Sequence, residues 1–457
     1  MRTYIKKITG ADLPIVTAPT GAPPVKIYVG QSVHTDQRGL DSKDLDHGAY
    51  RMKAGKDYLV LLGKDTDDVQ DKPGSGGAVY PSSRDDRKRA VEAWHKKYGD
   101  QWSSPFLSYF KGYHDKLGLW ASDEHGSLNA VNDFLRSLGV EWYMPGEFGE
   151  ILPRLTSISL PEVDKTVRPE FAMRSMGFYV NAPFMASADE FLWQLRLGLN
   201  PNGDIGGHGI QYMLGTEAAK KDHPEYFALY GGKRETESRG GKPCCSSPGL
   251  LASGLGFARL MFDEYHKEVV SLMPTDGYSA LCDCPLCKGK GTPDRGRDGS
   301  LSDYVWTFIN EAGRTVAKTH PAKKVSCYAY GVYLLPPETI DRFSSNVAIG
   351  ICQNRAYFHE SETRDKYRVL RNTWLQKTSG RPFCIWEYYL HARDNGNLEG
   401  IPVYYPHLIA EDLRSLKGMV AGEGIEVYCG IGSLNDPRPD PALAISHLNC
   451  WITARLW

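Results

Sequence analysis

The fold is decided by the stretch Val269-Val270-Ser271-Leu272-Met273-Pro274-Thr275-Asp276-Gly277 and by the loop Cys282-Asp283-Cys284-Pro285-Leu286-Cys287 that follows it. The apolar run with β-branched residues predicts a buried strand, because strands covered on both faces are apolar along their length. We expect the strand to stop at the proline, carboxylate and glycine, which places Asp276 at its end. If the strand belongs to a parallel α/β barrel, this end lies on the functional face.

Strand and helix patterns alternate regularly after residue 170. Apolar or aromatic runs predict eight strands, near residues 171–180, 208–213, 243–245, 269–273, 325–330, 347–352, 383–389 and 424–428. Eight strand–helix units are typical of a (β/α)8 TIM barrel, which we assign to residues 166–457. Strands also alternate with helices in residues 1–165, and they predict a smaller N-terminal α/β domain before the barrel.

Length and charge exclude several classes of protein. A chain of 457 residues favours two domains, and a formal net charge of -1 leaves no basic field to attract nucleic acid. We find no apolar stretch near the roughly 20 residues that span a bilayer. The first ten residues do not have the pattern of a signal peptide. Because both ends of the chain read as trimmed, this gives no prediction about export of the native protein.

Carboxylates follow, flank or occupy three of the predicted strands: Asp276, Glu387, and the pair Glu423 and Glu426. On a barrel they are expected to face one mouth, and cleavage of a glycosidic bond usually needs two such groups, one protonated and one ionised. We expect Glu387 to be the general acid, since its aromatic neighbours would raise its pKa, and Asp276 to stay ionised. A single strand-end carboxylate is equally often a solvated loop residue or a helix cap, so the hypothesis rests on several together.

Aromatic and basic residues near the predicted mouth are candidates for sugar binding. Flat rings and a histidine beside paired glycines suit a sugar, and an arginine suits a carboxylated one. The alternatives are a structural histidine in a turn and ordinary ion-pairing arginines. The residues assigned to substrate binding are His208, Trp386, Tyr388, Tyr330 and Arg355.

Three cysteines with C-x-C-x-x-C spacing indicate a metal or disulfide site. Cys282, Cys284 and Cys287 would need one more thiolate for a tetrahedral zinc site, and the pair Cys244–Cys245 lies on the neighbouring predicted strand. We take Cys245 as the fourth ligand of a structural zinc, with no cofactor needed for catalysis. Two disulfides would use the same number of thiols, and this alternative stays open.

Several segments in order resemble glycoside hydrolase family 163, formerly domain of unknown function 4838. They are Leu138-Gly-Val-Glu-Trp-Tyr-Met-Pro-Gly-Glu-Phe-Gly-Glu150, His223-Pro-Glu-Tyr-Phe-Ala-Leu229 with Gly232-Lys-Arg234, Asp276-Gly277 with the cysteine loop, and Trp386-Glu-Tyr-Tyr389. The resemblance implies hydrolysis of a β-linked N-acetylglucosamine in a glycan, by a secreted or periplasmic protein. It also implies an N-terminal domain similar to the non-catalytic ones of family 20 hexosaminidases and family 67 α-glucuronidases. We expect aspartate more often than glutamate at the position of Glu387 in that family.

The sequence therefore predicts a glycoside hydrolase that acts on an oligosaccharide or glycan. One rival is a uronic-acid glycosidase, which would need an arginine or lysine over the barrel mouth. Another rival is a catalytically silent carbohydrate-binding barrel.

Overall fold

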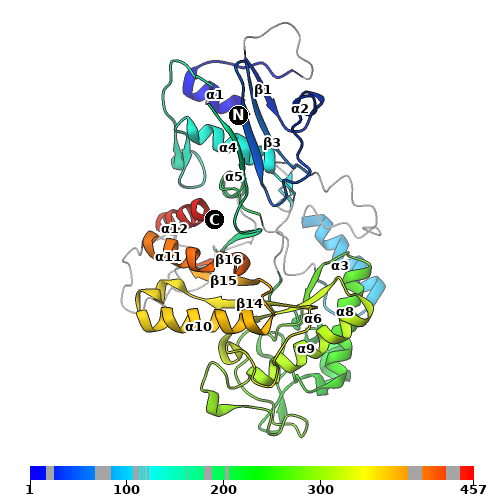
Figure 1. The fold of residues 1–457 in the computed structure, drawn as a ribbon. Helices are drawn as coiled ribbons and strands as arrows, with labels where there is room; N and C mark the ends of the chain where they lie inside the picture. Colours follow the sequence, from blue (N-terminus) through cyan, green and yellow to red (C-terminus); the bar gives the residue numbers. More distant parts are fainter. Residues whose placement is uncertain are drawn as a thin grey trace.

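The computed structural model describes residues 1–16, 25–66, 84–105, 113–114, 117, 119–120, 123–160, 162–179, 188–200, 205–389, 404–428 and 443–457. Two sheets organise these residues, one in each half of the chain (Figure 1). Within the described residues, we find no helix whose length and hydropathy would let it cross a membrane.

The N-terminal sheet has four strands in the order β1-β3-β2-β8. Strands β1 (Lys26–Val29) and β3 (Tyr58–Gly63) are parallel, and β2 (Tyr50–Ala54) pairs antiparallel with β3 and with β8 (Asp164–Val167). Helix α4 (Gly126–Ser137) packs against β3 so closely that a Cβ on Gly63 would lie 2.1 Å from the backbone of Gly126. The other elements of this half are α1 (Arg2–Thr9), α2 (Val33–Asp36), α3 (Arg84–Tyr98), β4 (Tyr113–His114), β5 (Leu119–Trp120), β6 (Glu141–Trp142), η1 (Glu147–Gly149) and β7 (Glu150–Ile151).

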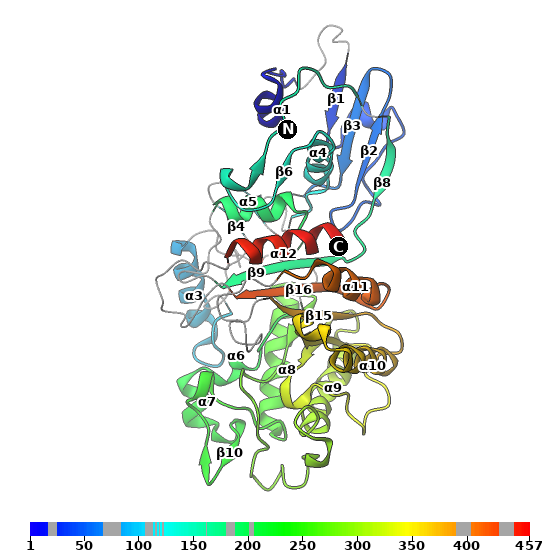
Figure 2. The ribbon, with the colours of Figure 1, turned by 90° about the vertical axis from the view of Figure 1, so that its left-hand side faces the viewer.

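The second half contains a curled, open sheet of six parallel strands, about half a barrel (Figure 2). Its order is β12-β13-β14-β15-β16-β9. The strands are β9 (Met173–Tyr179), β12 (Val269–Ser271), β13 (Lys324–Ala329), β14 (Val347–Gln353), β15 (Phe383–Tyr389) and β16 (Val420–Tyr428). Apolar side chains such as Val325, Ile351 and Ile385 are fully buried, as expected of parallel strands with covered faces.

The prediction of eight strands was wrong for the second and third strands. Residues 205–210 run beside β12 without forming a ladder, and Ile210 donates its N–H to Met273 at 3.1 Å. Glycines explain this, because Gly206 has φ +80° and a Cβ on Gly209 would lie 1.8 Å from the Ser271 oxygen. Near residue 243 only an isolated bridge forms, between Phe227 and Pro243.

Helices cover the sheet between its strands. Helix α8 (Pro248–Asp263) begins as the sequence predicts, with Ser247 accepting the N–H of Leu250 at 3.2 Å. The other elements are α5 (Ala188–Arg196), α6 (Gln211–Leu214), α7 (Glu217–Asp222), η2 (Pro224–Tyr226), β10 (Leu229–Tyr230), β11 (Lys233–Arg234), η3 (Ser238–Gly240), η4 (Pro293–Arg295), α9 (Ser302–Thr319), η5 (Gly331–Tyr333), η6 (Arg355–His359), α10 (Ser361–Lys377), α11 (Pro406–Leu416) and α12 (Leu443–Leu456).

Helix α12 and strand β9 both provide contacts between the two halves of the chain. Helix α12 lies between the N-terminal unit and the parallel sheet in both views (Figures 1 and 2), and its Trp451 packs on Tyr143. Arg174 on β9 is buried and donates to the carbonyl oxygens of His47, at 3.0 Å, and Gly198. The division into domains 1–165 and 166–457 stays a prediction; β8 carries the first sheet on to Val167.

Candidate active site

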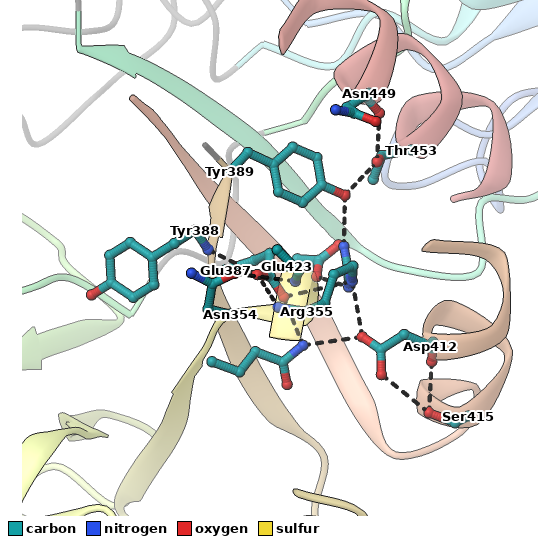
Figure 3. Close-up of polar contacts among 12 residues, drawn as sticks. Asn354, Arg355, Glu387, Tyr388, Tyr389, Asp412, Ser415, Glu423, Asn449 and Thr453 are labelled. Carbon is teal, nitrogen blue, oxygen red and sulfur yellow. Dashed lines mark hydrogen bonds and ion pairs between the residues drawn. The ribbon is translucent and has the colours of Figure 1, made fainter. Parts of the chain in front are cut away.

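Strand β15 carries candidate residues on both of its faces. Side chains alternate along a strand, so Trp386 and Tyr388 point to one face and Glu387 and Tyr389 to the other. In Figure 3 the ring of Tyr388 points away from Glu387 and Tyr389. We call the face of Trp386 and Tyr388 the inner face, and the face of Glu387, which meets helices α11 and α12, the outer face.

A buried arginine organises the outer face. Arg355, the first residue of η6, has no exposed surface, and its guanidinium forms hydrogen bonds with three neighbours (Figure 3). Its Nε lies 2.9 Å from Asp412 Oδ2, its Nη1 donates to the Tyr389 hydroxyl at 2.8 Å, and its Nη2 binds Glu423. The predicted role of Arg355 in substrate binding is therefore wrong, because no part of it reaches the surface.

Glu387 belongs to the same buried cluster. Its Oε1 accepts the backbone N–H groups of Arg355 at 2.8 Å and Tyr388 at 3.0 Å, and its Oε2 accepts Gln353 Nε2 at 2.8 Å. The side chain is 0% exposed. The expected position of Glu387 in one cleft with Trp386 and Tyr388 is wrong, since it faces the helix layer instead.

This cluster contains one more carboxyl group than guanidinium groups. Three carboxyl groups (Glu387, Asp412 and Glu423) meet two guanidinium groups, those of Arg355 and Arg371. Burial raises the pKa of Glu387 to about 8 and also raises the pKa of Glu423. Burial works against ionisation of Asp412 too, but Arg371 and Arg355 hold its pKa below the ordinary value. The excess carboxyl group and the raised pKa values of Glu387 and Glu423 favour one protonated carboxyl group in the cluster.

The inner face carries a half-buried glutamate between aromatic rings. Trp386 Nε1 donates to Glu426 Oε2 at 2.8 Å, and Glu426 lies in register with Tyr388 on the neighbouring strand. The ring of Tyr328 meets Trp386 edge-on at 5.5 Å. Glu426, Trp386 and Tyr388 are all partly exposed.

A second carboxylate lies beyond the end of β12. This strand ends at Ser271, so Asp276 lies in the following loop rather than at the strand end. His208 Nδ1 donates to the carbonyl oxygen of Pro274 at 2.6 Å, and its Nε2 lies 3.8 Å from Asp276 Oδ1. The two side chains are 30% and 32% exposed.

A tyrosine lies near each of these two carboxylates. The ring of Tyr330, which follows β13, lies 6.2 Å from that of His208. Burial raises the pKa of Tyr388, and the neighbouring Cys352, Glu426 and Tyr330 raise it further. We call six half-buried side chains the inner-face group: His208, Asp276, Tyr330, Trp386, Tyr388 and Glu426.

Residues 144–455 match the family model described as "Domain of unknown function (DUF4838)". The chain belongs to this family. No curated protein matches it.

Solved structures give slight similarities. A glycoside hydrolase family 5 enzyme, PbGH5A from Prevotella bryantii B14, is 12% identical over 50% of this chain and 69% of its own, with a TM-score of 0.28. A mutant of that enzyme in complex with a xyloglucan tetradecasaccharide is 11% identical over the same shares, with the same TM-score. The catalytic core of xylanase A is 10% identical over 62% of this chain and 99% of its own, again with a TM-score of 0.28. Similarities this slight carry no argument, so the function is argued from the site.

Four cysteines lie together, as the sequence predicts, but the fourth of them is not the predicted one. Cys282, Cys284 and Cys287 lie together with Cys244, and their sulfur atoms are all within 4.8 Å of one another. The predicted fourth member, Cys245, is buried beside the cluster but does not belong to it. Because two adjacent residues point in different directions, only one of the pair reaches the other three sulfurs.

The sequence analysis missed the partners that hold the outer face. Gln353 and Asp412 were not singled out, and Glu423 was noted only as a possible barrel-mouth residue. A signal for Gln353 existed, since it lies in register with Glu387 at the end of an apolar strand. Asp412 gave none, because it looks like any polar residue of an amphipathic helix.

Proposed function

We propose that the chain is a glycoside hydrolase that cleaves a β-linked N-acetylglucosamine, with Asp276 and Glu426 as its carboxyl groups. The observation that carries the proposal is that both side chains are half-exposed in one inner-face group on a parallel sheet. Glycosidic cleavage usually needs one protonated and one ionised carboxyl group. The sugar is proposed from the resemblance to glycoside hydrolase family 163.

Glu426 is the proposed general acid. Trp386 and Tyr388 flank its carboxyl group and keep part of the surrounding water away. The indole N–H holds Oε2, so the proton that passes to the leaving oxygen is carried on Oε1.

Asp276 is the proposed ionised group. It lies in a partly exposed loop, and the bond from His208 to Pro274 keeps the imidazole Nε2 directed toward it. An ionised carboxylate there orients the N-acetyl group of the substrate, whose carbonyl oxygen then attacks the sugar carbon. Such substrate assistance is an established exception to the use of a carboxylate nucleophile.

The rings of the inner-face group supply sugar contacts. Tyr330, Trp386 and Tyr388 are each partly exposed, and a sugar ring packs its apolar face on such rings. The uronic-acid alternative is weaker, since its candidate cation, Arg355, is buried on the outer face.

The deciding experiment measures hydrolysis of nitrophenyl glycosides by the purified chain. We expect cleavage of the N-acetylglucosaminide but not of the glucuronide, and a loss of roughly 10²–10⁴-fold in kcat for Glu426→Gln. The loss should be larger with a poor alcohol leaving group than with an activated phenol, because the phenol needs no acid. Asp276→Asn should slow both substrates alike, and a thiazoline analogue of the sugar should inhibit the wild type.

Two results would overturn the proposal. Binding of glycans without hydrolysis of any tested glycoside would favour a carbohydrate-binding barrel. Loss of activity in Glu387→Gln with full activity in Glu426→Gln would return the acid to the outer face.

A further inference from the structure

Four buried cysteines come from two segments that are far apart in the sequence. Cys244 precedes helix α8, and the other three lie in the loop after β12. Their exposed fractions range from 0% to 4%. This cluster lies outside the inner-face group and takes no part in the proposed reaction.

The spacing of the sulfur atoms suits a metal ion. The Sγ of Cys244 lies 3.5 Å from that of Cys287 and 3.7 Å from that of Cys284, and Cys284 and Cys287 are 3.5 Å apart. A disulfide needs about 2.05 Å. A tetrahedral zinc ion with Zn–S bonds of about 2.3 Å places its sulfurs about 3.8 Å apart.

The loop also has the local structure of a metal-binding turn. Cys287 donates its N–H to the carbonyl oxygen of Cys284 at 2.9 Å, and Gly289 adopts φ +77°, which an L-residue avoids. The N–H groups of Leu229, at 3.2 Å, and Cys284, at 3.5 Å, point at Cys282 Sγ. Donors aimed at a sulfur stabilise the negative charge that a bound thiolate carries.

A tyrosine contacts one of the sulfur atoms, and hydrogen bonds join the two segments that carry the cysteines. The Tyr304 hydroxyl lies 3.1 Å from Cys287 Sγ. Lys242 binds the carbonyl oxygen of Asp276, and Thr275 Oγ1 donates to the carbonyl oxygen of Gly241 at 2.6 Å. The segment that enters Cys244 is thus joined to the segment that leads to Cys282.

We propose that Cys244, Cys282, Cys284 and Cys287 bind one structural zinc ion. Four sulfur ligands with no open position suit a structural ion, and soft thiolates favour zinc over the oxygen-binding cations. The ion closes the ring formed by the segment before α8 and the loop after β12. This proposal does not depend on the glycosidase proposal.

Elemental analysis of the full chain, purified without added zinc, tests the proposal. We expect about one equivalent of zinc, because four-thiolate sites bind it tightly. Titration of the folded protein with a mercurial reagent and a zinc indicator should release the same equivalent. Replacement by cobalt should give the absorption spectrum of tetrahedral thiolate coordination.

Serine variants identify the ligands. Cys244→Ser and Cys284→Ser should lose the metal, whereas Cys245→Ser, a buried neighbour outside the cluster, should keep it. If the ligand variants do not fold, the mercurial titration of the wild type still decides the metal. Iron in place of zinc, disulfide-linked peptides from these cysteines with no metal, or loss of metal only in Cys245→Ser would each overturn the proposal.

Discussion

Replacing Glu387 with glutamine separates a buried structural carboxyl group from a catalytic one. The side chain is fully buried among the charges around Arg355, and its pKa is raised from the ordinary 4.5 to about 8, first of all by burial. The folded protein therefore holds a proton on this group over a pH range in which the unfolded chain has released it. A glutamine in its place cannot ionise in either state.

The expected change in the free energy of unfolding follows from the difference between the pKa of Glu387 in the folded protein and in the unfolded chain. Since the folded pKa is the higher one, the stabilisation is complete below about pH 4.5 and is lost as the pH rises toward 8. Each pH unit in this window changes the free energy of unfolding by about 1.4 kcal/mol. Relative to Glu387→Gln, the wild type should lose about 4–5 kcal/mol between pH 4.5 and pH 8.

The assay is urea denaturation of both proteins at several pH values between 5 and 8. The difference between them is the informative quantity, because titrating groups outside the buried cluster contribute equally to both. A difference that stays constant across this range would refute the argument for a retained proton. In the same preparations, Glu387→Gln should keep hydrolysis within about tenfold, far less than the roughly 10²–10⁴-fold effect of a general acid.

Three other substitutions give expected outcomes. Arg355→Met leaves the buried carboxylates without their cation and should lower the free energy of unfolding by about 3–5 kcal/mol, measured by urea denaturation. Gly209→Ala forces a Cβ against the Ser271 oxygen and should cost about 1–3 kcal/mol, whereas Gly207→Ala, with no atom within 4 Å, should change stability by less than about 0.5 kcal/mol. Trp386→Phe keeps a ring but removes the N–H on the proposed acid; it should shift the pH profile of kcat, and an unchanged profile would show that this bond does not tune the acid.

Apolar patterning predicted the strands that are buried on both faces. The predicted run 383–389 coincides with β15, and 325–330 and 347–352 match β13 and β14 to within a residue at each end. The predictions of strands failed where the alternation of apolar and polar side chains does not indicate the backbone conformation. The segment with Gly206, Gly207 and Gly209 is shaped by its contact with Ser271, and such a contact between distant segments cannot be seen in the sequence.

The composition of the candidate site was partly predictable, but its arrangement was not. Asp276 lies near His208, which lies near Tyr330, and Glu426 binds Trp386, but that all of them share one cleft stays a prediction. Glu387 was joined to them because it is their neighbour in the chain. Because side chains alternate along a strand, Glu387 faces away from Trp386 and Tyr388. Only the structure shows that the buried Arg355 lies on the face of Glu387.

The two faces of β15 depend on one another. On the outer face, Glu387 accepts the backbone N–H of Tyr388, so the buried charges hold the strand at the residue whose ring lies on the inner face. Glu423 and Glu426 stand in the same relation on β16, with Glu423 bound to Arg355 and Glu426 to Trp386. Our hypothesis is that this costly burial of charge is retained because it sets the position of the neighbouring groups. Substitutions that weaken the outer cluster should therefore disturb the geometry of the inner-face group before they unfold the chain. In a series of outer-face variants, the loss of kcat compared with the loss in free energy of unfolding would measure that coupling.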